Sequence, residues 1–184
     1  ELGGKSAAIV YDDADIDNLI DSIRWGIFYN AGQVCSAMSR VIVPQKLHDE
    51  ISERAGELAK SLSVGPGSER TKFGLNMGSM ISELQRDRAI NLCQKAQTEG
   101  ATTVTGGHKL NRPGWFLEPT VFSNVKPDME IAQVEVFGPV LSIIPYETDE
   151  QAISIANGTE YGLVSGVFTK DLDRAMSSAK KMRA

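Results

Sequence analysis

Ala7-Ala8-Ile9-Val10 is a short apolar run that ends at a pair of aspartates, which predicts a buried β-strand rather than a helix. A helix should follow, because Asp15 is a suitable N-cap and apolar residues then recur at spacings of three and four as far as Ile27. Arg40-Val41-Ile42-Val43 is largely β-branched and is followed by a proline, which predicts a second buried strand. Strand, helix and strand in this order are typical of a βαβ unit, whose two strands run parallel.

The rest of the chain extends the same pattern. Apolar residues at helical spacing predict further helices at residues 47–62, 80–97, 149–156 and 172–179. Strands are predicted at residues 102–105, 140–144 and 164–168, and apolar pieces of undecided type at 115–117 and 120–122. The sequence has no repeat and no linker between these elements. It therefore predicts one α/β domain over residues 1–184, with a mainly parallel sheet flanked by helices.

Composition limits the class of protein. The 184 residues include 19 Lys and Arg against 24 Asp and Glu, and this net charge of −5 argues against a nucleic-acid partner. No apolar run reaches the ~18 residues of a membrane span, so we expect no membrane partner. Cys35 and Cys93 form neither a disulfide framework nor a metal clip, which predicts a reduced, cytoplasmic location and no metal. Because the chain opens on Glu1 instead of Met, we expect a fragment.

Two residues could carry covalent or acid–base chemistry. Cys35 lies in Gly32-Gln33-Val34-Cys35-Ser36, and as a thiolate it would be a nucleophile. Composition alone favours the other interpretation, in which Cys35 is a small buried hydrophobic residue. The same interpretation is favoured more strongly for Cys93, because it lies on an apolar helix stripe. Glu1 could act as a general base beside Leu-Gly-Gly, where the backbone allows close approach, or could be an ordinary terminal carboxylate.

Other short motifs have competing interpretations. Gly4-Lys5-Ser6 could end a phosphate-binding P-loop, but a P-loop opens a helix, whereas a strand is predicted to follow here. The segment Glu135-Val136-Phe137-Gly138-Pro139 combines an acid, an aromatic residue and a turn, and Phe137 could equally belong to the core. His48 and His108 are expected at the surface, and neither has a partner at a meaningful spacing.

Taken together, these segments resemble the aldehyde dehydrogenase superfamily. Glu1-Leu2-Gly3-Gly4-Lys5-Ser6 and the segment 28–35 are similar to its two signature motifs, and Cys35 follows Glu1 by the family's interval of 34 positions. Glu135-Val136-Phe137-Gly138-Pro139-Val140 is similar to a third motif. Further similarity is found at residues 106–107, 114–120, 157, 161–163 and 167–172. The resemblance therefore covers the whole chain in order.

The resemblance implies a mechanism. Cys35 would attack the carbonyl carbon of an aldehyde to form a thiohemiacetal, which becomes a thioester when its hydride passes to a nicotinamide. Glu1 would activate the water that hydrolyses this thioester, which favours water over coenzyme A as the acyl acceptor. The backbone N–H of Cys35 would donate a hydrogen bond to the developing oxyanion.

The resemblance also implies the cofactor contacts. Glu135 would bind the hydroxyls of the nicotinamide ribose of NAD or NADP, Phe137 would pack near the nicotinamide, and Leu2 would lie beside its carboxamide. Gln85 and Arg88 would reach the adenosine ribose. The substrate pocket would include Tyr29, Val34 and Ser36 and would suit an aldehyde with an apolar or aminoalkyl chain.

The expected function is therefore that of the catalytic domain of an NAD(P)-dependent, non-acylating aldehyde dehydrogenase, a homo-oligomer when intact. We expect the nucleotide-binding and oligomerisation segments, including the asparagine that supplies the second oxyanion donor, to lie outside residues 1–184. The alternative is an isolated fold module without turnover. In either case the 184-residue chain alone is expected to bind NAD(P) weakly or not at all.

Overall fold

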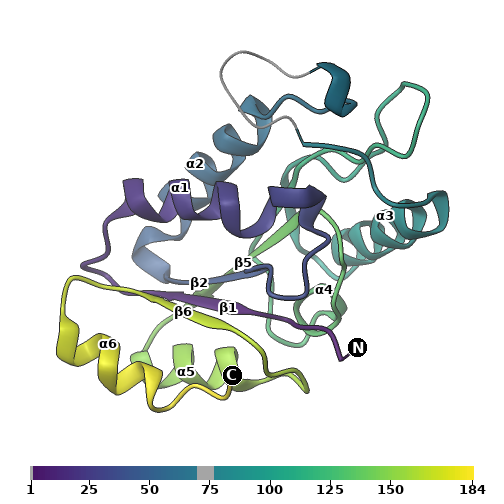
Figure 1. Cartoon of the computed structure of the whole chain (residues 1–184). Helices are drawn as coiled ribbons and strands as arrows, with labels where there is room; N and C mark the ends of the chain where they lie inside the picture. Colours follow the sequence, from purple (N-terminus) through teal and green to yellow (C-terminus); the bar gives the residue numbers. More distant parts are fainter. Residues whose placement is uncertain (1, 70–76) are drawn as a thin grey trace.

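The computed structural model describes residues 2–69 and 77–184 (Figure 1). Within these residues the strands form one six-stranded sheet in the order β3-β4-β5-β2-β1-β6. The strands are β1 (Ala7–Val10), β2 (Arg40–Pro44), β3 (Thr102–Thr105), β4 (Thr120–Ser123), β5 (Val140–Tyr146) and β6 (Ser165–Phe168). Neighbouring strands are parallel except β3 and β4, which are antiparallel. The prediction of a mainly parallel sheet flanked by helices is confirmed.

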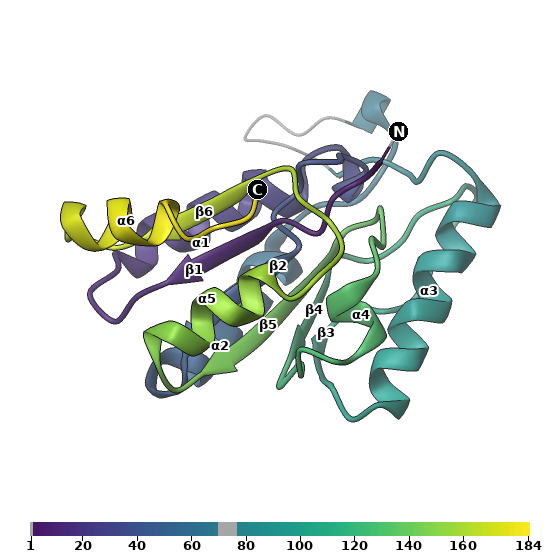
Figure 2. The ribbon, with the colours of Figure 1, turned by 90° about the horizontal axis from the view of Figure 1, so that it is seen from below.

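Helices cover both faces of this sheet. The described residues contain α1 (Ile16–Ile27), α2 (His48–Ser61), α3 (Glu83–Thr98), α4 (Glu130–Gln133), α5 (Asp149–Asn157) and α6 (Leu172–Ala179). Figure 1 shows α1 and α2 on one face and α5 and α6 on the other, and Figure 2 shows α3 beside α4 near the β3–β4 edge. This arrangement buries β1 and β2 from both sides, so each of their residues is buried.

The predicted βαβ unit forms as the sequence indicates. The Asp15 carboxylate accepts the backbone N–H of Asn18 and caps α1, and the helix buries Leu19, Ile23 and Ile27. Each large apolar side chain removed from water in this way contributes about 1.5–3 kcal/mol to folding. The residues that α1 buries are thus those that the spacing of apolar residues predicts.

The structure differs from the sequence predictions at two places. Residues 120–122, whose element type the sequence does not decide, belong to β4, which pairs antiparallel with β3 residues 16 to 21 positions away. His48 was expected at the surface, but it is buried: its Nε2 accepts the backbone N–H of Asn124 at 3.2 Å. The prediction failed because it rested on the polarity of the imidazole, whereas His48 precedes Ile51 by three residues and lies on the buried face of α2.

The three motif segments precede three parallel strands. Gly4 comes shortly before β1, Cys35 before β2, and Glu135 before β5. The amino ends of parallel strands meet at one edge of a sheet, so this connectivity gathers the motifs at that edge. Ligands of open α/β sheets more often lie at the opposite, carboxyl edge. Over residues 2–69 and 77–184, no helix combines the length and the apolar character needed to cross a membrane.

Candidate functional site

The candidate site is formed by the motif segments that precede β1, β2 and β5, and Gly4 lies where they meet. A Cβ atom at this position would stand 2.2 Å from the Cys35 carbonyl oxygen, which only a glycine avoids. The Gly4 backbone N–H also donates a hydrogen bond to Oε1 of Glu135 at 3.0 Å. The segment before β1 thus touches both the cysteine motif and the Glu135 motif.

Gly3 completes the contact with Glu135. It adopts a left-handed backbone conformation with φ of +70°, and a Cβ there would lie 2.4 Å from Oε2 of Glu135. The carboxylate of Glu135 therefore rests on a backbone surface that two consecutive glycines leave open. Leu2 is 96% exposed and projects from the same segment. Glu1 lies outside the described residues.

The two cysteines have different environments. Cys35 is exposed, whereas Cys93 is buried in α3, where burial raises the pKa of its thiol to about 12. Only the thiolate form is nucleophilic, so Cys93 is both shielded and disfavoured in its reactive form, whereas Cys35 is accessible. The interpretation of Cys35 as a buried hydrophobic residue is wrong, and that of Cys93 is confirmed.

An unusual turn leads to Cys35. Asn30, Ala31 and Gly32 have successive φ values of +51°, +54° and +69°. Such left-handed conformations are unfavourable for Asn30 and Ala31 and must be held by their surroundings. Gly32 approaches the third motif so closely that a Cβ there would be 2.1 Å from the carbonyl oxygen of Gly138. The loop of residues 28–36 that carries Cys35 (the cysteine loop) and the loop of residues 135–139 (the Glu135 loop) therefore meet backbone to backbone.

Gln33 is a residue of this site whose role sequence reasoning missed. Its side chain donates to the Asn30 carbonyl at 3.1 Å, and the Asn30 side chain donates to the Gln33 carbonyl at 3.0 Å. Gln33 Oε1 also accepts the backbone N–H of Ile81 at 2.8 Å. Its position two residues before Cys35 was the available signal, but the contact with residue 81 depends on the tertiary fold.

Gln85 and Arg88 lie against the Glu135 loop. The Gln85 amide donates to the carbonyl oxygens of Val136 and Phe137, each at 3.0 Å. The Arg88 guanidinium donates to the carbonyl oxygens of Val136 at 3.1 Å and Glu135 at 2.9 Å. The structure thus brings both residues to the predicted cofactor motif, with their donors directed at its backbone.

The residues predicted to form the substrate pocket lie close to Cys35 in the sequence and differ in exposure. Val34 is half-buried and shares the lining of a small cavity with Phe137, Ser36 is half-buried, and Tyr29 is 54% exposed. Phe137 is itself half-buried and also borders an open groove of about 420 Å³, whose other lining residues include Trp115. The cysteine and Phe137 motifs thus share one surface region.

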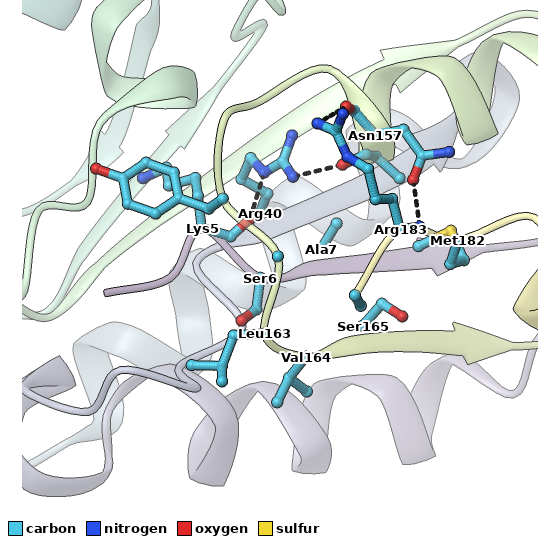
Figure 3. A pocket seen from close by; sticks show the side chains of 14 residues that line it. Lys5, Ser6, Ala7, Arg40, Asn157, Leu163, Val164, Ser165, Met182 and Arg183 are labelled. Atoms are coloured by element: carbon cyan, nitrogen blue, oxygen red, sulfur yellow. Dashed lines mark hydrogen bonds between the residues drawn. The ribbon is translucent and has the colours of Figure 1, made fainter. Parts of the chain in front are cut away.

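Lys5, which follows Gly4, is buried and lines a small pocket together with Arg40 (Figure 3). Burial, together with the positive charge of Arg40, lowers the pKa of its ammonium to about 7, although Glu135 acts in the opposite direction. Arg40 is also buried, and it donates to the carbonyl oxygens of Lys5, Ile155 and Ala156 at 2.8–2.9 Å. The P-loop interpretation of this segment is wrong, because Lys5 leads into strand β1 instead of a helix.

Comparison with known proteins identifies the family of this site. A model of the aldehyde dehydrogenase family matches residues 1–184. The chain is 42% identical to aldehyde dehydrogenase 1A1 of Mesocricetus auratus and 40% identical to cytosolic aldehyde dehydrogenase 1 of Mus musculus, covering all of this chain and 36% of each relative.

Solved structures agree with this match. An aldehyde dehydrogenase from Mycobacterium tuberculosis, solved with NAD+, is 41% identical with a TM-score of 0.95, over 100% of this chain and 38% of that one. The NAD+ complex of the enzyme from Bacillus cereus is 38% identical with a TM-score of 0.93, over 99% and 36%. The chain thus spans little more than a third of these relatives. Since its sequence matches the family model from end to end and its fold matches these enzymes, the chain belongs to the aldehyde dehydrogenase family.

Proposed function

We propose that the intact protein containing this chain is an NAD-dependent, non-acylating aldehyde dehydrogenase and that residues 1–184 form its catalytic domain. The contact of Gly4 with both Cys35 and Glu135 carries this proposal, because it joins the proposed nucleophile to the proposed ribose-binding carboxylate. The chain covers about a third of its relatives, so the activity is proposed for the longer protein.

The proposed nucleophile is the Cys35 thiolate. Its sulfur forms a bond to the aldehyde carbon, and the carbonyl oxygen takes up the negative charge as a thiohemiacetal. The backbone N–H of Cys35 is proposed to donate to this oxygen. NAD, when bound, accepts the hydride that leaves this carbon, and the sulfur then holds the acyl group as a thioester.

Glu1 is the proposed base for the second half of the reaction. Its carboxylate would take a proton from water, whose oxygen attacks the thioester carbon, and the Cys35 sulfur leaves as the thiolate. The product is a carboxylic acid. A water-activating base favours hydrolysis over transfer of the acyl group to another thiol.

The proposed cofactor site centres on Glu135 and Phe137. A carboxylate can accept hydrogen bonds from two ribose hydroxyls. The Glu135 carboxylate is held for this role by the Gly4 backbone N–H, in space that Gly3 leaves free because it has no Cβ. Phe137 would pack against the nicotinamide, and exposed Leu2 would lie near its carboxamide. NADP is the alternative cofactor. Gln85 and Arg88, which contact the backbone of residues 135–137, also belong to the proposed cofactor site.

Substrate and assembly are further proposals. Tyr29, Val34 and Ser36, which flank Cys35 in the sequence, are proposed to form part of a pocket for an aldehyde with an apolar or aminoalkyl chain. A homo-oligomer in the cytosol is proposed for the intact protein, in line with the relative from Mus musculus that is named cytosolic.

The test uses the intact enzyme and three variants. Cys35→Ala should abolish aldehyde oxidation, whereas Cys93→Ala, which removes the buried thiol, should retain it. Glu1→Gln should keep the first burst of NADH and slow the steady-state rate, because deacylation follows hydride transfer. Aldehyde oxidation by the Cys35→Ala enzyme would refute the proposal. A Glu1→Gln enzyme with an unchanged steady-state rate would refute the role of Glu1.

A further inference from the structure

We propose that Gln85 and Arg88 are positioning residues, which act on the cofactor by holding the backbone of residues 135–137 in place. This inference rests on the proposed function, because it concerns how Glu135 and Phe137 are presented to NAD. It differs from the expectation drawn from the family resemblance, in which both side chains contact the adenosine ribose directly.

Four hydrogen bonds from one helix carry the argument. Gln85 and Arg88 are three residues apart on α3 and therefore lie on the same face. Their side chains donate to three consecutive carbonyl oxygens, those of Glu135, Val136 and Phe137, at 2.9–3.1 Å. Val136 receives one hydrogen bond from each side chain. All four hydrogen bonds are accepted by backbone carbonyls, so they depend on the path of the backbone and not on which side chains residues 135–137 carry.

The loop needs such support. Phe137 has a φ of +54°, a left-handed conformation that costs a residue with a side chain about 1–2 kcal/mol. The following carbonyls, of Gly138 and Pro139, accept backbone N–H groups within the fold. Those of residues 135–137 are instead met by α3. The two hydrogen bonds from Gln85, to the carbonyl oxygens of Val136 and Phe137, thus lie on either side of the strained φ of Phe137.

The segment before β1 provides a second point of attachment for residues 135–137. Gly4 donates to the Glu135 carboxylate, and Gly3 leaves room for it. Glu135 is therefore fixed at its side chain by Gly4 and at its carbonyl by Arg88. A shift of the backbone on the α3 side would move the carboxylate away from a bound ribose.

Gln85→Glu distinguishes positioning from direct contact. Glutamate has the size of glutamine and still offers acceptors to a ribose hydroxyl, so a direct contact would survive. It cannot donate, however, and it would place carboxylate oxygens against two carbonyl oxygens. Arg88→Lys keeps the charge but loses the planar fork that reaches two carbonyls together. Gln94→Ala, at an exposed glutamine of the same helix, is the matched control.

The experiment measures two quantities in the intact enzyme. Hydrogen–deuterium exchange without cofactor reports the backbone of residues 134–139, and calorimetric titration reports the Kd for NAD. We expect Gln85→Glu to speed exchange there and to weaken NAD binding at least tenfold, which is about 1.4 kcal/mol. Arg88→Lys should give smaller changes of the same kind, and Gln94→Ala none. In steady-state assays the KM for NAD should rise while the KM for aldehyde stays constant.

Two results would overturn the inference. Weaker NAD binding with unchanged exchange would mean that the substitution does not act through the backbone of residues 134–139. Faster exchange with unchanged NAD binding would mean that this backbone does not govern the cofactor. The milder Arg88→Lys variant decides the matter if Gln85→Glu fails to fold. Failure of the proposed function has a different signature, since the wild-type enzyme would then bind NAD but oxidise no aldehyde.

Discussion

At the scale of single residues, burial separates two chemically identical thiols. Cys35 is exposed, whereas Cys93 is buried and the pKa of its thiol is raised to about 12 by that burial. Iodoacetamide should therefore alkylate Cys35 much faster than Cys93 in the folded protein, because the reagent needs access and a thiolate. Peptide mapping by mass spectrometry over time measures both rates. The difference should disappear in denaturant, and equal rates in the folded protein would contradict the prediction.

At the scale of elements, the approach of the cysteine loop to the Glu135 loop depends on Gly32. We expect Gly32→Ala to lower the free energy of unfolding by several kcal/mol, because its Cβ would meet the Gly138 carbonyl at 2.1 Å and its φ of +69° would be strained. A backbone oxygen cannot rotate away as a side chain could, so both loops would have to move.

Urea denaturation measures the effect of Gly32→Ala, and Gly78→Ala is its control. Gly78 has no described atom within 4 Å of a Cβ built at its position, so that substitution should change the free energy of unfolding by less than about 0.5 kcal/mol. Similar losses in both variants would show that the contact between the loops does not contribute.

At the scale of the whole molecule, Arg174 ties the last helix to the rest of the fold. Its guanidinium, on α6, donates to Asp12 after β1 and to Asp149 at the start of α5, each at 2.8 Å. It also lies 3.9 Å from the centre of the Tyr11 ring. These contacts join the N-terminal strand to the C-terminal helix at the carboxyl edge of the sheet, away from the proposed site.

This cluster should make stability sensitive to acid. Hydrogen bonds from Arg174 and Lys46 lower the pKa of Asp12 from 3.8 to about 2. The unfolded chain therefore binds a proton between these values that the folded chain does not, and the contribution of Asp12 is present above pH 4 and is lost as the pH falls through 2. Asp12→Asn should lower stability at pH 7 by under about 1 kcal/mol, since the pair is half-exposed.

The same variant should reduce the fall in stability between pH 4 and pH 2. Urea midpoints at several pH values test this expectation, and Asp128→Asn, at an exposed loop aspartate, controls for the loss of one surface charge. A pH profile of the Asp12→Asn protein that parallels the wild type throughout would contradict it.

The sequence by itself determined the order of the main elements and the motifs. Apolar spacing within ten or so residues is enough to place β1, α1 and β2, because each periodicity is local. It also determined that Cys35, Glu135 and Phe137 belong to motifs, by their resemblance to a family. The whole-chain family match confirms that resemblance.

Only the tertiary structure decided how those motifs meet. Gly4 contacts Glu135 across 131 positions, and Gln85 and Arg88 reach the 135–137 backbone across 47 to 52. His48 is buried by a segment 76 positions away. Such contacts follow from the order of the strands and from close backbone approach, and neither property is written in the spacing of apolar residues along the chain.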